Sequence, residues 1–294
     1  MKVRPVRHPD DLDDLRRLFE QCRIADGHAP IGEHKYVDLM AGTSEASMGR
    51  VFFVEDQLIA YVHLGRRRKY TGWVLETAIH PGYRRPGVIR SVLQSAIDLV
   101  AEKDEGPIRV WVYHPAVAET VKDLGFHEER QLLQMRLPLP PAQAATVPAG
   151  MRLAPFRVGR DEERWIEVNN RAFAGHPENG GWTPEILADR IRREWFDADG
   201  FLMAWQGSNL AGFCWTKVHP GALGEIYVIA VDPDFQGRSL GPWLTLEGLW
   251  NLYRRRQATT AMLYVDAANG PAVGMYERLG FELDHVDGSF VRAL

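Results

Sequence analysis

The stretch Val231–Pro242 has residue types that can hold an anion at the start of a helix. An apolar strand ends at Asp232-Pro233, a turn of small residues follows, and Pro242 stands near the start of the next helix. Backbone N–H groups at a helix start carry partial positive charge, and Gly237 and Gly241 let the backbone approach a ligand closely. The stretch therefore predicts a phosphate or pyrophosphate site; a simple helix cap after a strand is the alternative.

Two residues are candidates for proton transfer. Glu225 lies near the start of the apolar strand 224–231, where an acidic residue is unusual. Tyr276 lies on a short amphipathic helix that follows Asn269. A carboxylate can take a proton from an amine, directly or through a water, and a phenol can give one to a leaving group. Each residue also has a structural interpretation, as an edge-exposed glutamate and as a core tyrosine.

The elements that must position these groups occur twice along the chain. Each half is expected to run strand, helix, helix, three strands, helix, strand, helix, strand. The strand 73–79 before His80-Pro81 matches the strand 224–231 before Asp232-Pro233, and each half later repeats Leu-Gly-Phe after a short helix. A repeat of ~150 residues is too long for a solenoid unit, so it indicates a duplicated domain. The fold class expected is therefore α/β, with two similar domains.

A proline-rich stretch separates the two halves. Prolines fix the backbone and remove hydrogen-bond donors, so the stretch that begins at Pro138 reads as a connection without regular structure. We expect domains at 1–140 and 151–294, joined by a linker at 141–150.

Composition excludes several classes of protein. The 294 residues carry a net charge of −4, which argues against a nucleic-acid-binding surface. We find neither a membrane-length apolar run nor the apolar core of a secretory signal. Cys22 and Cys214, the two cysteines, fit a reducing cytoplasm and lack metal-ligand spacing. We expect a cytoplasmic monomer with no metal, nucleic-acid or membrane partner.

The anion loop and the tyrosine helix together resemble the acyl-CoA site of the GNAT acetyltransferase superfamily. Its loop pattern, Gln/Arg-x-x-Gly-x-Gly/Ala, matches Gln236–Gly241, with Ser239 where the superfamily usually has glycine. Its asparagine and tyrosine match Asn269 and Tyr276. Further segments resemble the mycothiol acetyltransferase family, over essentially the full chain and more strongly in the second half; they are 26–33, 169–183, 215–220, 224–228 and 263–265.

The resemblance implies two tandem GNAT-like domains, each a mixed, mostly antiparallel twisted sheet flanked by helices. It implies acetyl transfer from acetyl-CoA to the cysteine amine of cysteinyl-glucosaminyl-inositol, which forms mycothiol. The alternative is a GNAT enzyme acting on another small amine or a protein N-terminus. A non-catalytic acyl-CoA sensor is a third possibility, against which the presence of both Glu225 and Tyr276 argues.

The resemblance also assigns roles to residues. Glu225 would be the general base and Tyr276 the general acid that protonates the departing thiolate. A bulged central strand would free a backbone donor for the acetyl carbonyl at Ile229, Ala230 and Val231. The remaining acetyl-CoA contacts would be Gln236, Gly237, Arg238, Ser239, Leu240, Gly241, Pro242, Asn269, Gly270, Pro271, Ala272, Val273 and Gly274. The acceptor contacts would be Glu33, Glu178, Lys217, Glu225 and Tyr264.

The first half retains a weaker copy of the cofactor pattern. Pro86 removes an amide, Ile89 replaces the small residue of the loop, and Val121 stands in register with Tyr276. We expect the first domain to be non-catalytic and to form a wall of the acceptor site through Glu33. The positions of a possible second acetyl-CoA site are Thr77, Ala78, Ile79, Arg85, Pro86, Gly87, Val88, Ile89 and Arg90.

Overall fold

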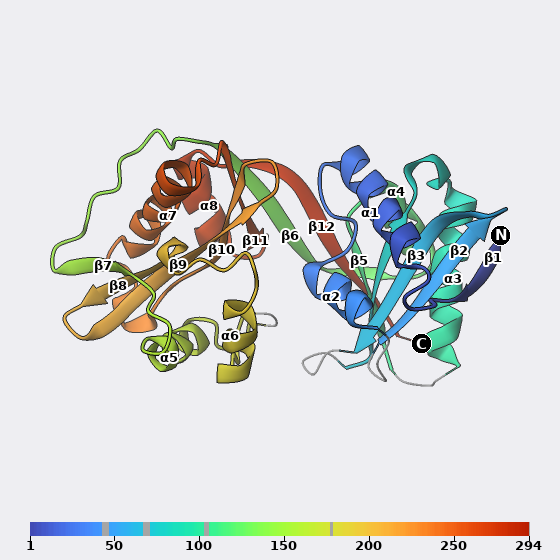
Figure 1. The fold of residues 1–294 in the computed structure, drawn as a ribbon, viewed down its shortest axis with the longest axis horizontal. Helices are drawn as coiled ribbons and strands as arrows, with labels where there is room; N and C mark the ends of the chain where they lie inside the picture. The colour runs from blue at the N-terminus through green and yellow to red at the C-terminus, as the bar shows by residue number, and fades with distance from the viewer. Residues whose placement is uncertain (43–46, 67–70, 103–105, 177–178, 294) are drawn as a thin grey trace. The chain divides into compact units, whose positions relative to one another are not determined.

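The computed structural model describes residues 1–42, 47–66, 71–102, 106–176 and 179–293, and its helices and strands follow the order expected for each half (Figure 1). The elements of the first half are β1 (Lys2–Pro5), α1 (Leu12–Asp26), α2 (Glu33–Ala41), β2 (Ser47–Val54), β3 (Gln57–Arg66), β4 (Trp73–Ile79), α3 (Pro86–Ala101), β5 (Ile108–Val112), α4 (Pro115–Asp123) and β6 (His127–Pro138). Those of the second half are β7 (Met151–Pro155), α5 (Glu162–Ala172), α6 (Pro184–Ile191), β8 (Phe201–Gln206), β9 (Asn209–His219), β10 (Leu223–Val231), α7 (Leu240–Arg256), β11 (Thr260–Asp266), α8 (Gly270–Leu279) and β12 (Glu282–Arg292). Short 3₁₀ turns lie at Pro81–Tyr83, Ala198–Gly200 and Pro233–Phe235.

The chain divides into two compact units. The first comprises Met1–Leu132 and Val286–Leu294, and the second comprises Leu133–His285. The strand order is β1-β2-β3-β4-β5-β12 in the first unit and β6-β11-β10-β9-β8-β7 in the second. Most pairs are antiparallel, while β4–β5 and β10–β11 are parallel. The expected mixed α/β fold is confirmed, and the last strand of the chain completes the sheet of the first unit, where Gly288–Arg292 pair with β5.

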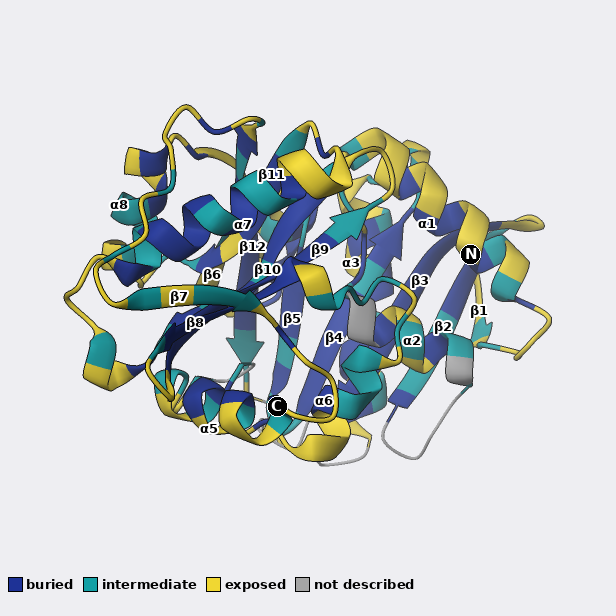
Figure 2. Ribbon diagram, turned by 60° about the vertical axis from the view of Figure 1, so that its left-hand side comes forward, coloured by how far each residue is buried: buried dark blue, intermediate teal, exposed yellow. Residues whose placement is uncertain are grey.

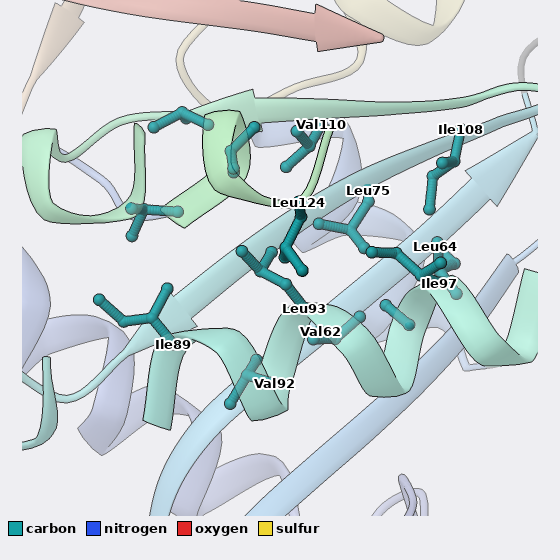
Figure 3. Close-up of a cluster of buried hydrophobic side chains, with 14 of the residues drawn as sticks. Val62, Leu64, Leu75, Ile89, Val92, Leu93, Ile97, Ile108, Val110 and Leu124 are labelled. Carbon is teal, nitrogen blue, oxygen red and sulfur yellow. The ribbon is translucent and has the colours of Figure 1, made fainter. Parts of the chain in front are cut away.

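The first unit buries apolar side chains on both faces of its sheet. Ile89, Val92 and Leu93 of α3 pack toward Val62 of β3 and Leu75 of β4 (Figure 3). The spacing of these helical residues places them on one side of α3, as expected for an amphipathic helix. On the opposite face, α1 and α2 contribute the second cluster, which includes Leu15, Leu18, Phe19, Cys22, Ile31 and Leu39.

The second unit sandwiches its central strands between two different cores. On one face, α7 covers β9 and β10 with aliphatic residues such as Leu244 and Leu249, and α8 packs beside it on β11. On the other, α5 and α6 enclose an aromatic cluster in which Phe201 stacks on Trp215 at a centroid distance of 4.3 Å. Trp182 also belongs to this cluster. The central strands are therefore buried on both sides (Figure 2), and any charged group on them needs a specific partner.

Within the described residues, no helix is both long and apolar enough to cross a membrane. The same part of the chain has no helix or strand between residues 139 and 150.

Candidate active site

Strand β10 bulges at Tyr227 and parts from β11. Opposite β10, the β9 partner changes from Thr216 at Ile226 to Trp215 at Val228, so Tyr227 is an inserted residue. The parallel pairing with β11 covers Leu223–Ile226, whereas Val228–Val231 remain paired with β9 alone among the described strands. Backbone groups on the β11 side of this strand end therefore have no ladder partner, and they can bond a ligand instead.

The loop that follows β10 has the conformation of an anion cradle. Gly237 and Ser239 both adopt left-handed conformations, with φ of +76° and +58°. Across the described chain, the amides of Gly237, Arg238 and Ser239 donate to no backbone oxygen. Alternating backbone conformations of this kind gather N–H groups around an anion, next to the helix start at Leu240.

The conformation and packing of the loop explain the residue types expected at Ser239 and Gly241. Glycine would be favoured at Ser239 because the position is left-handed, a conformation that costs a side-chain-bearing residue free energy. At Gly241, an added Cβ would lie 3.2 Å from Sδ of Met275 on α8. Gly241 thus permits close packing of α7 on α8.

Helix α8 brings Tyr276 to the α7 side of the sheet. The Asn269 side chain caps this helix by accepting from the Ala272 amide at 3.3 Å. Tyr276 is buried, and burial raises the pKa of its hydroxyl well above the ordinary tyrosine range, with a smaller contribution from Cys214. Cys214 is the β9 partner of Ile229, so the tyrosine lies near the separated end of β10. A phenol that stays protonated at neutral pH is suited to donate a proton.

Glu225 lies on the opposite face of the sheet, where alternation along β9 and β10 also places Lys217 and His219. The Glu225 side chain is 10% exposed, and its Oε2 lies 2.6 Å from Nε2 of His219. Lys217 is the direct β9 partner of Glu225. Its Nζ lies 4.6 Å from the centre of the Trp195 ring and 5.5 Å from that of Tyr227. The carboxylate and the ammonium are therefore both held by specific neighbours.

Tyr264 joins this face from β11. Its hydroxyl accepts a hydrogen bond of 2.6 Å from Nε2 of Gln134, a buried residue of β6. Beside Lys217, a groove of about 550 Å³ is lined by Glu194, Trp195, Phe196, Asp197, Thr216, Lys217, Val218 and Arg256. The groove combines aromatic surface with charged groups, as expected of a site for a polar organic ligand.

Comparison with known proteins identifies the family. Residues 164–281 match the model of the Acetyltransferase (GNAT) family. Over 282 residues the chain is 44% identical to the Mycothiol acetyltransferase of Thermomonospora curvata, an alignment that covers 94% of this chain and 92% of that protein. The protein of the same name from Salinispora arenicola is 41% identical, with coverages of 93% and 90%. The chain belongs to the mycothiol acetyltransferase family. It is therefore an N-acetyltransferase, and the family resemblance of its motifs is confirmed.

Solved structures share the fold of this family member over its full length. A GCN5-related N-acetyltransferase from Sphaerobacter thermophilus matches with a TM-score of 0.77 at 21% identity, covering 99% of this chain and 95% of that one. A tandem GNAT protein from the clavulanic acid biosynthesis pathway matches with a TM-score of 0.78 at 18% identity, with coverages of 99% and 98%. At these identities the likeness confirms the tandem GNAT fold.

The first unit of this family member shares one feature of the candidate cofactor site and lacks two: β4 pairs with β5 over Trp73–Glu76 and beyond that with β3 alone among the described strands, but the bulge and the left-handed turn are missing from its described residues. Strand β4 pairs with β3 without any register shift, so it has no bulge. None of the residues 84–90 has a left-handed conformation, and the Val88 and Ile89 amides donate back to Arg85. The positions of the possible second acetyl-CoA site differ in burial. Ala78, Ile79 and Ile89 are buried in the core, and Thr77 and Val88 are half-buried. The exposed positions are Arg85, Pro86, Gly87 and Arg90, and Arg90 forms an ion pair with Asp123 at 3.2 Å.

Two residues expected to contact the acceptor are not placed by these observations. Glu33 begins α2 in the first unit, where only its backbone is described. Glu178 lies outside the described residues. The roles expected for these and the other site residues remain predictions.

Three residues of the candidate site were missed from the sequence. His219 could have been found, because it stands two positions after Lys217 on a strand and so shares its face. Gln134 contacts Tyr264 across 130 positions of sequence, and no local pattern indicates that pairing. Trp195 lies in an irregular segment after α6, where periodicity gives no orientation.

Proposed function

We propose that this chain transfers the acetyl group of acetyl-CoA to the cysteine amine of cysteinyl-glucosaminyl-inositol, the reaction that forms mycothiol. The observation that carries the proposal is the separation of β10 from β11 after Ile226, with Glu225 just before it on one face of the sheet and Tyr276 toward the other face. A thioester bound in that gap would be accessible to a base and an acid from opposite sides.

The residues present fit acetyl-CoA. The left-handed turn at Gly237 and Ser239 offers amides for its pyrophosphate, and the backbone after Ile226 offers hydrogen-bonding groups for its extended arm. When bound, acetyl-CoA supplies an activated acetyl thioester. The contacts expected from the sequence along Ile229–Val231, Gln236–Pro242 and Asn269–Gly274 belong to this proposal.

Each step of the proposed reaction has a group in this chain. Glu225 accepts the proton of the acceptor ammonium, whose pKa is near ~8 for an α-amino group. A backbone amide within Ile229–Val231 stabilises the developing charge on the carbonyl oxygen, and such a donor contributes about 3–4 kcal/mol at comparable sites. Tyr276 gives its proton to the thiolate as it departs. Lys217 and Tyr264 orient the hydroxyl-rich acceptor on the Glu225 face.

The proposal includes a simple set of partners. We propose a cytoplasmic monomer that binds one small-molecule acceptor and requires no metal, nucleic acid or membrane. Light scattering of the purified protein, with and without acetyl-CoA, measures the oligomeric state directly.

The experiment is an acceptor panel with product analysis. The purified protein is incubated with acetyl-CoA and cysteinyl-glucosaminyl-inositol, other small amines, or peptides with free N-termini. The expected product is a singly acetylated pseudo-disaccharide that has lost its primary amine and kept its thiol, because the amine is the nucleophile. Preferential acetylation of another amine would support the alternative acceptor class, and acetyl-CoA binding without turnover of any acceptor would support a sensor.

A further inference from the structure

His219 holds one oxygen of the candidate base. It is the last residue of β9 and pairs with Leu223, two positions before Glu225 on β10. Its Nε2 lies 2.6 Å from Oε2 of Glu225, and its side chain is 27% exposed while that of Glu225 is 10% exposed. The nearly buried carboxylate of Glu225 is therefore connected to solvent by its contact with the partly exposed imidazole of His219.

The contact fixes which carboxylate oxygen is available. An ionised carboxylate only accepts hydrogen bonds, so Nε2 of His219 is the donor in this contact. Oε2 is thereby occupied, and Oε1 remains for the acceptor amine or its bridging water. The neighbouring Lys217 ammonium is drawn toward the rings of Trp195 and Tyr227. It does not replace the histidine contact at Oε2.

We propose that His219 is a positioning residue for Glu225, a role that rests on the proposed function of that carboxylate. His219 orients the side chain so that Oε1 faces the amine, and it keeps Oε2 hydrogen-bonded while the site is closed by substrate. Catalytic groups that are held in place by a second hydrogen bond lose less freedom when the transition state forms. The effect of His219 is therefore expected in turnover and not in the binding of acetyl-CoA.

Two variants separate this role from simple packing. His219→Phe keeps a ring of similar volume and removes the donor. His219→Gln places an amide N–H within similar reach of Oε2 and cannot titrate. At pH 7 we expect His219→Phe to lower kcat about 10- to 100-fold, less than the ~10²–10⁴-fold expected when the base itself is removed. We expect His219→Gln to recover most of that loss, with the KM for acetyl-CoA unchanged in both.

The pH profile gives a second readout. An acceptor whose amine is already neutral needs no base, so the deficit of His219→Phe should shrink as the pH rises from 7 toward about 10, past the amine pKa near ~8. The other charged or titratable groups described on this face are Lys217 from β9, Tyr227 from β10, Tyr264 from β11, and Glu194, Asp197 and Arg256 along the groove. All of them are present in both variants, so the comparison isolates the histidine contact.

Controls distinguish this proposal from the proposed function. Arg164→Ala removes an exposed ion pair of the same unit and should leave all parameters unchanged. Wild-type kcat in His219→Phe, while Glu225→Gln is inactive, would overturn the role of His219 and leave the function standing. Equal losses in both histidine variants with a raised KM for the acceptor would make His219 a substrate contact instead. Wild-type turnover in Glu225→Gln would overturn the role of Glu225 itself.

If His219→Phe does not fold, the kcat of His219→Gln decides the question. A value near wild type supports positioning, and a loss like that of Glu225→Gln overturns it.

Discussion

Arg84 donates to both carboxylate oxygens of Asp26, at 2.5 and 2.6 Å, and its Nε donates to the Ile79 carbonyl at 2.9 Å. Arg84 is the first residue of the loop in the first unit that corresponds to the cofactor loop of the second. Its charge is therefore neutralised by a half-buried partner, and the Ile79 carbonyl at the end of β4 is already occupied. A cofactor would have to displace these contacts before it could bind there.

We accordingly expect one tight acetyl-CoA site per chain. Isothermal titration calorimetry of the wild-type protein should give a stoichiometry near one, because the described loop 84–90 of the first unit has no left-handed residue, whereas Gly237 and Ser239 of the second unit are left-handed. Two equally tight sites would show that the first unit opens to ligand in spite of the Arg84–Asp26 pair.

Replacement of Gly241 should abolish cofactor binding, whereas the same replacement at Gly87 should not. An added Cβ at Gly241 meets Sδ of Met275 at 3.2 Å, while one at Gly87 has nothing within 4 Å. We expect Gly241→Leu to lose both calorimetric binding and turnover, and Gly87→Leu to retain both. A double variant, Gly241→Ala with Met275→Ala, relieves the packing conflict. If it regains folding but keeps a raised KM for acetyl-CoA, Gly241 is also required for ligand approach.

Glu225→Gln should lower kcat by about 10²–10⁴-fold, because it removes the proton acceptor and keeps the size of the side chain. The KM for acetyl-CoA should stay near its wild-type value, since Glu225 is on the face of the sheet opposite the α7–α8 core. Steady-state kinetics at pH 7 with varied acetyl-CoA measures both constants. A variant with wild-type turnover at that pH would contradict the assignment of the base.

Tyr276→Phe should slow turnover while leaving the fold intact, because the buried ring is kept. The loss should be smaller with an acyl donor whose leaving thiol has a lower pKa, since such a thiolate needs less help to depart. Rate measurements with thioesters of graded thiol pKa check this. Unchanged turnover with acetyl-CoA would make Tyr276 a packing residue.

The stability of the fold should fall in strongly alkaline solution. Burial raises the pKa of Tyr276 above its value in the unfolded chain, which is near ~10. Above that pH the unfolded state loses the phenolic proton while the folded state retains it, so the free energy of unfolding decreases as pH rises. Urea unfolding at about pH 8 and pH 10.5 should show a smaller decrease in Tyr276→Phe than in the wild type.

Periodicity and internal repetition predict the order of the elements in both halves, because each helix and strand must present an apolar face at its own period. The sequence also indicates the cofactor loop, whose glycines are local signals. It gives no sign of the Arg84–Asp26 pair or of the Gln134–Tyr264 bond, because each joins residues far apart in the chain. The pairing of β12 with β5 could not be predicted from the sequence for the same reason, since the residues of a strand do not specify which strand it pairs with.

The place of β12 bears on how the protein is made. Val286–Leu294 are translated after the whole of the second unit, yet they supply a strand of the unit that contains Met1–Leu132. Domains that are continuous in sequence fold one after another during synthesis. Here the unit whose residues are translated first cannot be finished until β12 has been synthesised. A cut within residues 141–150 would likewise leave each fragment short of one strand of its own unit, so neither half of the duplicated gene encodes a complete folding unit by itself.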